Sequence, residues 1–155
     1  MHNLTENNKN IWQFFIDVGG TFTDCFFTTP NSDEGVIKIP SSGHFYGLLE
    51  NNHTINVTSE LTDTIPQNFF SKFKVYDAFS DKHIGNATQS IDKTIEFEFS
   101  ASPLHATCTL GNKGKPSKVR LVSNYTAPYL AICLAQNVEP EKPLKVSEIT
   151  LGSTI

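Results

Sequence analysis

The chain has 155 residues and a formal net charge of −4, and 38% of its residues are hydrophobic against 18% charged. This is the balance of an ordinary globular protein with enough length for a buried core, so wholesale disorder is excluded. The lysines and arginines form no basic run, which gives no support to a nucleic-acid-binding surface. No apolar stretch has the length of a bilayer span, so we expect no membrane partner.

The first ten residues are polar and rich in asparagine, and they lack the apolar core of a signal peptide. We expect residues 1–10 to be a disordered N-terminus. The three cysteines are widely spaced and show no zinc-ligand spacing, so we expect free thiols in a reducing compartment and a cytoplasmic location. Cys25 alternates with aromatic residues, which favours core packing.

Two short apolar runs, 11–16 and 22–27, are rich in aromatic and β-branched residues and predict two strands. Between them the chain reads IDVGGTFTD over residues 16–24, with two glycines, two hydroxyls and two carboxylates. We therefore expect a hairpin with unusual chemistry at its tip. The simpler interpretation, which the Gly-Gly pair alone favours, is a purely structural turn.

The residue types of this turn suit a bound phosphate. The two glycines can take positive φ at no steric cost, consecutive backbone N–H groups can form an anion-binding concavity, and the threonines add hydroxyl donors. The carboxylate at the end of the first strand suits Mg²⁺, which prefers carboxylate oxygens and keeps most of its water. The second carboxylate is an anchor or a base. The candidate site residues are Gly19, Gly20, Thr21 and Thr23 for the phosphates, Asp17 for the metal and Asp24 for catalysis.

Beyond the turn, residues 30–35 form a turn cluster, and residues 36–39 predict a third strand. The segment KIPSSG at residues 38–43 indicates a domain boundary whose hydroxyls face the site. Residues 11–43 are thus expected to form the first hairpin and meander of one domain.

From residue 44 to residue 117 short segments with period-two alternation recur, as in antiparallel sheets with one wet face. We expect an inserted antiparallel β-barrel or sandwich module here. Within it, residues 65–70 suggest one helical turn that docks two aromatic rings, and residues 111–116 give a strong loop signal.

Residues 118–155 are expected to return to the first domain as a strand, a helix and a truncated strand. The first strand covers residues 119–122. Thr126 is a candidate helix cap, Pro128 fits the first turn, and the helix should stop near Asn137.

Three of these segments resemble one family. Residues 16–24 resemble the first phosphate motif of the actin-like ATPase superfamily, and within it GGTFTD is similar to the hydantoinase/5-oxoprolinase family, which includes N-methylhydantoinase A. The segment at 38–43 resembles that family's KVLSSG. Residues 127–132 (APYLAI) resemble its APVLAA helix, and residues 149–154 resemble its RLGTT strand.

The resemblance implies an α+β, β-rich fold: the N-terminal part of an actin-like (ribonuclease H-like) ATPase lobe with an inserted β module. It implies ATP and Mg²⁺ as cofactors and hydrolysis of a small cyclic amide or related substrate. The second phosphate motif and the adenosine motif are absent from these residues. We therefore expect an N-terminal fragment that is inactive alone and works with the rest of its polypeptide and a second hydantoinase-type subunit.

Two alternatives remain open. One is a fragment of a small-molecule kinase of the same superfamily, although Phe22-Thr23-Asp24 favours the hydantoinase side. The other is a non-catalytic β-rich binding module in which the Gly-Gly turn is structural.

Overall fold

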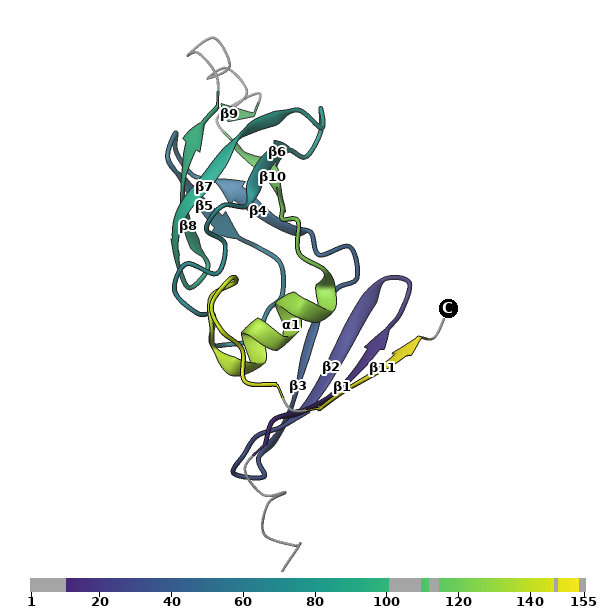
Figure 1. The fold of residues 1–155 in the computed structure, drawn as a ribbon. Helices are drawn as coiled ribbons and strands as arrows, with labels where there is room; N and C mark the ends of the chain where they lie inside the picture. The colour runs from purple at the N-terminus through teal and green to yellow at the C-terminus, as the bar shows by residue number, and fades with distance from the viewer. Residues whose placement is uncertain (1–10, 101–109, 112–114, 147, 154–155) are drawn as a thin grey trace, which may run out of the picture.

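The structure, a computed structural model, describes residues 11–100, 110–111, 115–146 and 148–153. The expected disordered N-terminus, Cys108 and the middle of the loop predicted at 111–116 lie outside these residues. The described residues form a four-stranded sheet, one helix and a closed β-barrel (Figure 1). None of their helical structure is long and apolar enough to span a bilayer.

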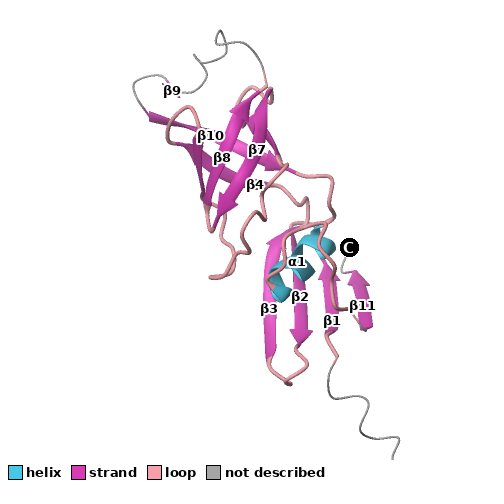
Figure 2. Ribbon diagram, turned by 60° about the vertical axis from the view of Figure 1, so that its left-hand side comes forward, coloured by secondary structure: helices cyan, strands magenta, loops and turns pink. Residues whose placement is uncertain are grey.

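The four-stranded sheet has the order β11-β1-β2-β3, with α1 on one of its faces (Figure 2). Neighbouring strands β1, β2 and β3 are antiparallel, whereas β11 is parallel to β1. Parallel neighbours need a crossover connection, and here the segment leading into β11 contains the helix. The elements are β1 (Gln13–Val18), β2 (Phe22–Thr28), β3 (Glu34–Pro40), α1 (Ala127–Gln136) and β11 (Glu148–Ser153).

The helix begins and ends where the sequence predicts. The Thr126 side chain accepts a hydrogen bond from the Tyr129 N–H at 3.4 Å, and a proline occupies the first turn. Asn137 has φ 53°, and its N–H is directed to the carbonyls of Cys133 and Leu134, as in a left-handed C-cap. The buried side of α1 packs on the sheet, where Cys25 is fully buried as expected. Burial raises the pKa of the Cys25 thiol to about 12.

The barrel confirms the expected antiparallel module that is separate from the first sheet. Its strands follow the order β4-β5-β8-β7-β6-β10, and pairing of β10 with β4 closes the ring. Closure leaves no exposed sheet edge in the ring. The strands are β4 (Phe45–Leu49), β5 (Thr54–Val57), β6 (Lys74–Asp77), β7 (His83–Ile91), β8 (Thr94–Phe99) and β10 (Lys115–Val122), with the short β9 (Leu110–Gly111) paired to β10.

Two expectations need correction. The strand predicted at 119–122 belongs to β10, which pairs with β4 and β6, so the boundary expected after residue 117 is wrong. Val119 and Leu121 are buried and alternate with partly exposed residues, which is the pattern of a barrel wall. Residues 67–72 form turns instead of a helical turn, although Phe69 and Phe70 are buried as expected.

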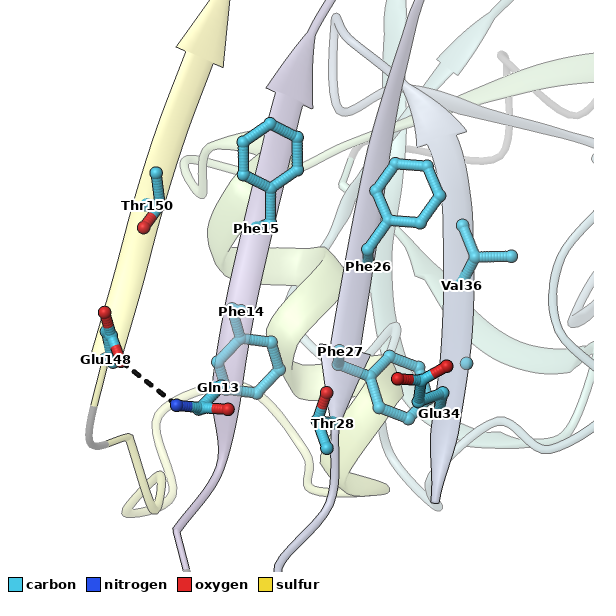
Figure 3. A pocket seen from close by; sticks show the side chains of 11 residues that line it. Gln13, Phe14, Phe15, Phe26, Phe27, Thr28, Glu34, Val36, Glu148 and Thr150 are labelled. Atoms are coloured by element: carbon cyan, nitrogen blue, oxygen red, sulfur yellow. Dashed lines mark hydrogen bonds between the residues drawn. The ribbon is translucent and has the colours of Figure 1, made fainter. Parts of the chain in front are cut away.

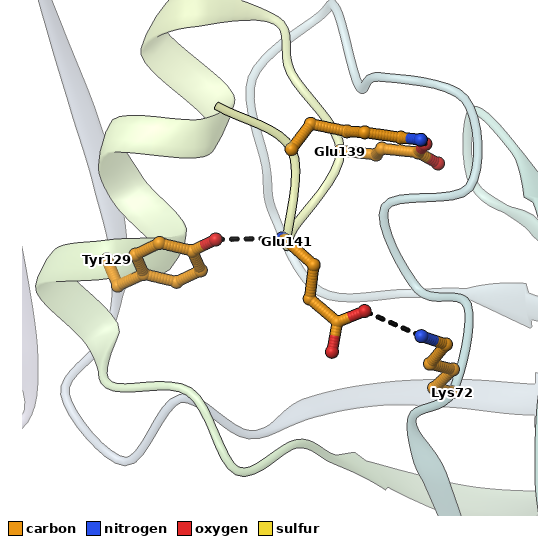
Figure 4. A network of polar contacts seen from close by, with 5 residues as sticks. Lys72, Tyr129, Glu139 and Glu141 are labelled. Carbon is orange, nitrogen blue, oxygen red and sulfur yellow. Dashed lines mark hydrogen bonds and ion pairs between the residues drawn. The ribbon is translucent and has the colours of Figure 1, made fainter. Parts of the chain in front are cut away.

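A hydrogen-bonded ion pair connects the barrel to the segment that follows α1 (Figure 4). Lys72 Nζ lies 2.6 Å from Glu141 Oε2, and the Glu141 N–H donates to the Tyr129 hydroxyl at 2.8 Å. The hydrogen bond with Glu141 raises the pKa of Lys72, and the same bond lowers the pKa of Glu141. Both side chains are largely exposed, so this contact orients the two parts more than it stabilises them.

Four phenylalanines form a buried aromatic cluster in the barrel module. Phe45, Phe69, Phe70 and Phe73 are each 0% exposed. Their ring centroids lie 4.9 to 6.1 Å apart, mostly with edge-to-face geometry. Such contacts add to the free energy of burial, so we expect this cluster to contribute substantially to the stability of the barrel.

We predict that Phe70→Ala lowers the free energy of unfolding by about 3–5 kcal/mol, because it removes a buried ring and leaves a cavity. The control is Phe79→Ala, whose ring is 92% exposed and should change stability by under about 0.5 kcal/mol. Urea titration followed by circular dichroism measures both variants. Equal midpoints for the two variants would contradict the packing described for the cluster.

Candidate functional site

The predicted phosphate turn connects β1 to β2 in a hairpin. The two strands stay paired as far as Val18 and Thr23, and the Gly19 N–H donates to the Phe22 carbonyl at 3.0 Å. Neither glycine of the turn has a positive φ, so the turn does not use the left-handed conformation that glycine permits. Among the described glycines, positive φ occurs at Gly43, at the end of the serine-rich segment. A Cβ at Gly20 would meet no atom within 4 Å, so the backbone is open to solvent there.

Ser41 fixes the shape of this turn from the other side. Its hydroxyl donates to the Gly19 carbonyl at 2.7 Å and lies 2.9 Å from the Thr23 hydroxyl. Its N–H donates to the Thr21 carbonyl at 2.9 Å. Three hydrogen-bond contacts therefore hold the turn against the segment that leaves β3.

These contacts give the two threonines different roles. Thr23 is 0% exposed and its hydroxyl is engaged by Ser41, so it holds the turn in place, and its expected direct role with phosphate is not supported. Thr21 is exposed. Within the described residues, the N–H groups of Gly20 and Thr21 donate to no carbonyl. The free donors of the turn are thus at residues 20 and 21.

The two carboxylates of the motif lie directly opposite each other. Asp17 and Asp24 are paired residues on β1 and β2, and Lys38 is the next residue across on β3. Lys38 Nζ lies 3.4 Å from Asp24 Oδ1 and 5.1 Å from the centre of the Phe22 ring. Like charges directly opposite each other destabilise a sheet. Lys38 offsets the charge of Asp24, whereas Asp17 forms no ion pair with any residue that the structure describes.

Asp17 carries the clearest sign of a missing partner. Its Oδ1 atom is buried and has no hydrogen-bond partner within the described residues. A buried carboxylate oxygen without a partner is costly and points to water or an ion. No group of three or more acidic, histidine or cysteine side chains gathers in the described part of the chain. Hydrated Mg²⁺ needs only one or two carboxylates, so Asp17 fits that ion and a fully protein-coordinated metal does not.

All six predicted site residues therefore lie on one hairpin, but they do not share one role. The residue that sequence reasoning did not single out is Ser41. The KIPSSG segment indicated that hydroxyls would face the site, but it could not indicate which serine reaches Gly19, because that depends on how the chain turns after β3.

At least three pockets have residues of the hairpin in their walls, and two of them are much larger than the third. One, of about 560 Å³, lies beyond the turn and includes Gly20 and Thr21 in its wall. The other, of about 620 Å³, covers the sheet face away from α1, where Phe15, Phe26 and Val36 project side by side (Figure 3). These three side chains are 48%, 48% and 53% exposed. Asp17 shares this face, because it lies two residues beyond Phe15 on β1.

No protein-family model, curated protein or solved structure matches the chain. The interpretation of the hairpin therefore depends on its own geometry and on the residues of its motif.

We predict that Ser41→Ala lowers the free energy of unfolding by about 1–3 kcal/mol, because it leaves the buried Thr23 hydroxyl and the Gly19 carbonyl without their partner. The neighbouring exposed hydroxyl provides the control, since Ser42 only accepts from the His44 N–H at 3.2 Å. Ser42→Ala should cost under about 0.5 kcal/mol. Hydrogen exchange by NMR should also speed up at Gly19 in Ser41→Ala alone. Unchanged exchange there would show that Ser41 does not fix the turn.

Proposed function

We propose that this chain supplies the phosphate-binding turn of an ATP-dependent hydrolase of cyclic amides, of the hydantoinase/5-oxoprolinase type. The observation that carries the proposal is the Asp17 carboxylate, whose buried Oδ1 lacks a partner. It stands two residues before a turn whose Gly20 and Thr21 N–H groups donate to no carbonyl in the described residues. An unpaired carboxylate and free backbone donors at one place suit a cation and an anion together, as in a magnesium nucleotide.

The sheet topology supports the same location. In open sheets with parallel strands, ligands bind outside the carboxyl ends of the strands. The parallel strands β1 and β11 end side by side at Val18 and Ser153. Their arrowheads point towards the barrel in Figure 2, at the end of the sheet that carries the turn. The proposed phosphate position is thus beside two adjacent strand ends.

Each residue of the hairpin has a separate part in this proposal. The N–H groups of Gly20 and Thr21 donate to phosphate oxygens, with the Thr21 hydroxyl beside them. Asp17 accepts from water molecules around Mg²⁺, and the Lys38–Asp24 pair keeps the neighbouring carboxylate from competing for the same cation. Ser41 and Thr23 keep the donors in position before the ligand arrives. Preorganised donors of this kind are the main contribution of a protein to phosphoryl transfer.

The substrate class comes from the motif resemblance and not from the geometry of the hairpin. ATP would supply the phosphoryl group that activates the ring amide towards water, so that water opens the ring and ATP yields ADP and phosphate. A small-molecule kinase would use the same turn and would retain the phosphoryl group on its product. Product analysis by ³¹P NMR separates the two reactions in any preparation that turns over ATP.

The test of the nucleotide site is a titration of ¹⁵N-labelled chain with ATP, with and without Mg²⁺. We predict that the amide signals of Gly20 and Thr21 shift on addition of Mg-ATP, and that Asp17→Asn weakens this binding about tenfold or more. The reason is that a charge-assisted hydrogen bond contributes about 1.5–3 kcal/mol. Without Mg²⁺ the variant and the wild type should bind ATP alike.

The matched control is Asp33→Asn, an exposed carboxylate in the turn between β2 and β3. This substitution also removes one negative charge, but at a position far from the phosphate turn. It should therefore leave Mg-ATP binding unchanged. Thermal melting of Asp17→Asn should stay close to that of the wild type. A lowered melting temperature with unchanged Mg-ATP affinity would assign Asp17 to packing and remove the metal role.

A further inference from the structure

The outer surface of the barrel strands β4, β10 and β6 carries a row of aromatic and basic side chains. On this surface Arg120 of β10 is paired with Tyr46 of β4 on one side and with Tyr76 of β6 on the other. The row points away from the barrel interior, because neighbours along the strands, such as Val75 and Leu121, are buried. Two lysines lie two residues away from this row on the same strands, so they share its outward direction. We call this surface the Arg120 face, and it consists of Tyr46, Lys74, Tyr76, Lys118 and Arg120.

Direct contacts join the members of the Arg120 face. The guanidinium carbon of Arg120 lies 5.3 Å from the centre of the Tyr76 ring, and Lys118 Nζ lies 4.7 Å from the centre of the Tyr46 ring. Cations at such distances are attracted to the faces of aromatic rings. The Tyr76 ring also meets the His83 ring edge-to-face, with the centroids 5.3 Å apart. Rings and cations therefore alternate across one continuous surface.

The turn between β6 and β7 adds an exposed phenylalanine beside this face. The Phe79 ring is 92% exposed. The Ala78 N–H donates to the Lys118 carbonyl at 3.0 Å, and the Asp81 carboxylate forms a hydrogen-bonded ion pair with Arg120. The turn is thus attached to β10 at two points, one on each side of Phe79. The ring contributes little to folding, and it is free to contact a ligand of the Arg120 face.

Arg120 has hydrogen-bonding capacity that the protein does not use. Its Nε atom is buried and has no hydrogen-bond partner within the described residues, where its guanidinium donates to the Asp81 carboxylate. A guanidinium carries five N–H donors in a planar fork that matches carboxylates and phosphates. Asp81 is exposed and lies in a turn, so another anion can take its place on Arg120.

We propose that the Arg120 face binds single-stranded nucleic acid, with its aromatic rings and Phe79 stacking on bases and its three cations contacting phosphates. The amino-acid sequence has no basic run because the cations come from two separate strands, Lys74 on β6 and Lys118 and Arg120 on β10. Folding gathers them on one surface of a chain whose overall net charge is −4. The inference uses the barrel alone and is independent of the proposed nucleotide site.

The arrangement of the rings favours a single strand over a duplex. Neighbouring strands of a sheet lie about 4.8 Å apart, so Tyr46 and Tyr76 are separated by about 10 Å across β10. A single strand can spread its bases onto separate rings, whereas the base faces of a duplex are covered by their neighbours. Aromatic stacking combined with cationic contacts to the backbone is the usual basis of single-strand binding without sequence preference.

The first test measures the fluorescence anisotropy of a labelled oligothymidine during titration with the chain. Its length of about 12 nucleotides lies within the usual range of single-strand sites. The wild-type chain should bind it more tightly than a duplex of the same length. Phe79→Ala should weaken single-strand binding about tenfold, because it removes one base-stacking ring. Phe26→Ala, which removes a half-exposed ring on the four-stranded sheet, should leave the affinity unchanged.

A second substitution is expected to act in the opposite direction. Asp81→Asn removes the carboxylate that occupies Arg120, so single-strand affinity should rise about threefold or more. The matched control is Asp92→Asn, an exposed residue in the turn between β7 and β8 whose φ of 50° resembles the 59° of Asp81. The control makes the same change in net charge and should raise the affinity less. Lys118→Gln should reduce the slope of log affinity against log salt by about 0.7, the value for one phosphate contact of a single strand.

The outcomes decide whether the face binds a single strand. Equal affinity for the single strand and the duplex, or no oligothymidine binding at low salt, would overturn the inference. Equal effects of Asp81→Asn and Asp92→Asn would also overturn it, because Arg120 would then have no part in binding. Binding to anionic lipid vesicles that depends on Phe79, without oligothymidine binding, would assign the face to a membrane surface instead. The comparison of single strand with duplex uses the wild-type chain and needs no variant to fold.

Discussion

The pairing of β10 with β4 is the constraint on which the arrangement of the whole chain depends. It sets Leu121 opposite Phe45, so the barrel begins and ends at neighbouring positions. A module whose two ends meet can be inserted between β3 and α1 without separating the sheet strands. The chain then leaves β10 close to where it left β3, and α1 can still pack on β1, β2 and β3. Barrel closure thus permits β11 to return beside β1.

The same junction connects the barrel to the hairpin. The segment from Pro40 to His44 carries Ser41, which holds the turn, and it leads directly into β4. Gly43 adopts φ 69° within this segment, and a Cβ there would lie 3.3 Å from the Tyr125 carbonyl. Any larger side chain would therefore strain the backbone and press on the segment before α1. The position of the turn and the position of the barrel wall are consequently set by one short, sterically restricted stretch.

Local patterns in the sequence were enough to predict three strands of the sheet and the helix. Short runs rich in aromatic and β-branched residues predicted β1 and β2, the segment after a turn cluster predicted β3, and the candidate cap Thr126 and the expected stop near Asn137 agree with the ends of α1. Local patterns do not show which of the two sheets a strand joins. Residues 119–122 have the same alternation whether they pair with β4 or with a strand of the other sheet, because partner choice depends on contacts distant in sequence.

The candidate site also combines residues that are close in sequence with contacts between residues that are far apart in sequence. The motif placed Asp17, Gly20 and Thr21 together because they are near neighbours in sequence. It could not show that Thr23 faces inward to Ser41, since that contact joins residues 18 positions apart. Nor could it show that Lys38 would lie beside Asp24, which depends on the register of β2 and β3. The sequence predicted which residues of the turn lie together, but it did not predict the partners around them.

Binding of a molecule to the sheet face away from α1 should change the heat capacity measurably. Phe15, Phe26 and Val36 leave about half of each side chain in water (Figure 3). Removing apolar surface from water lowers the heat capacity, whereas charge and hydrogen-bond contacts at the turn do so far less. The two surfaces of this sheet therefore have different thermal signatures. The temperature dependence of a binding enthalpy would distinguish a molecule that covers the aromatic face from one that occupies the turn.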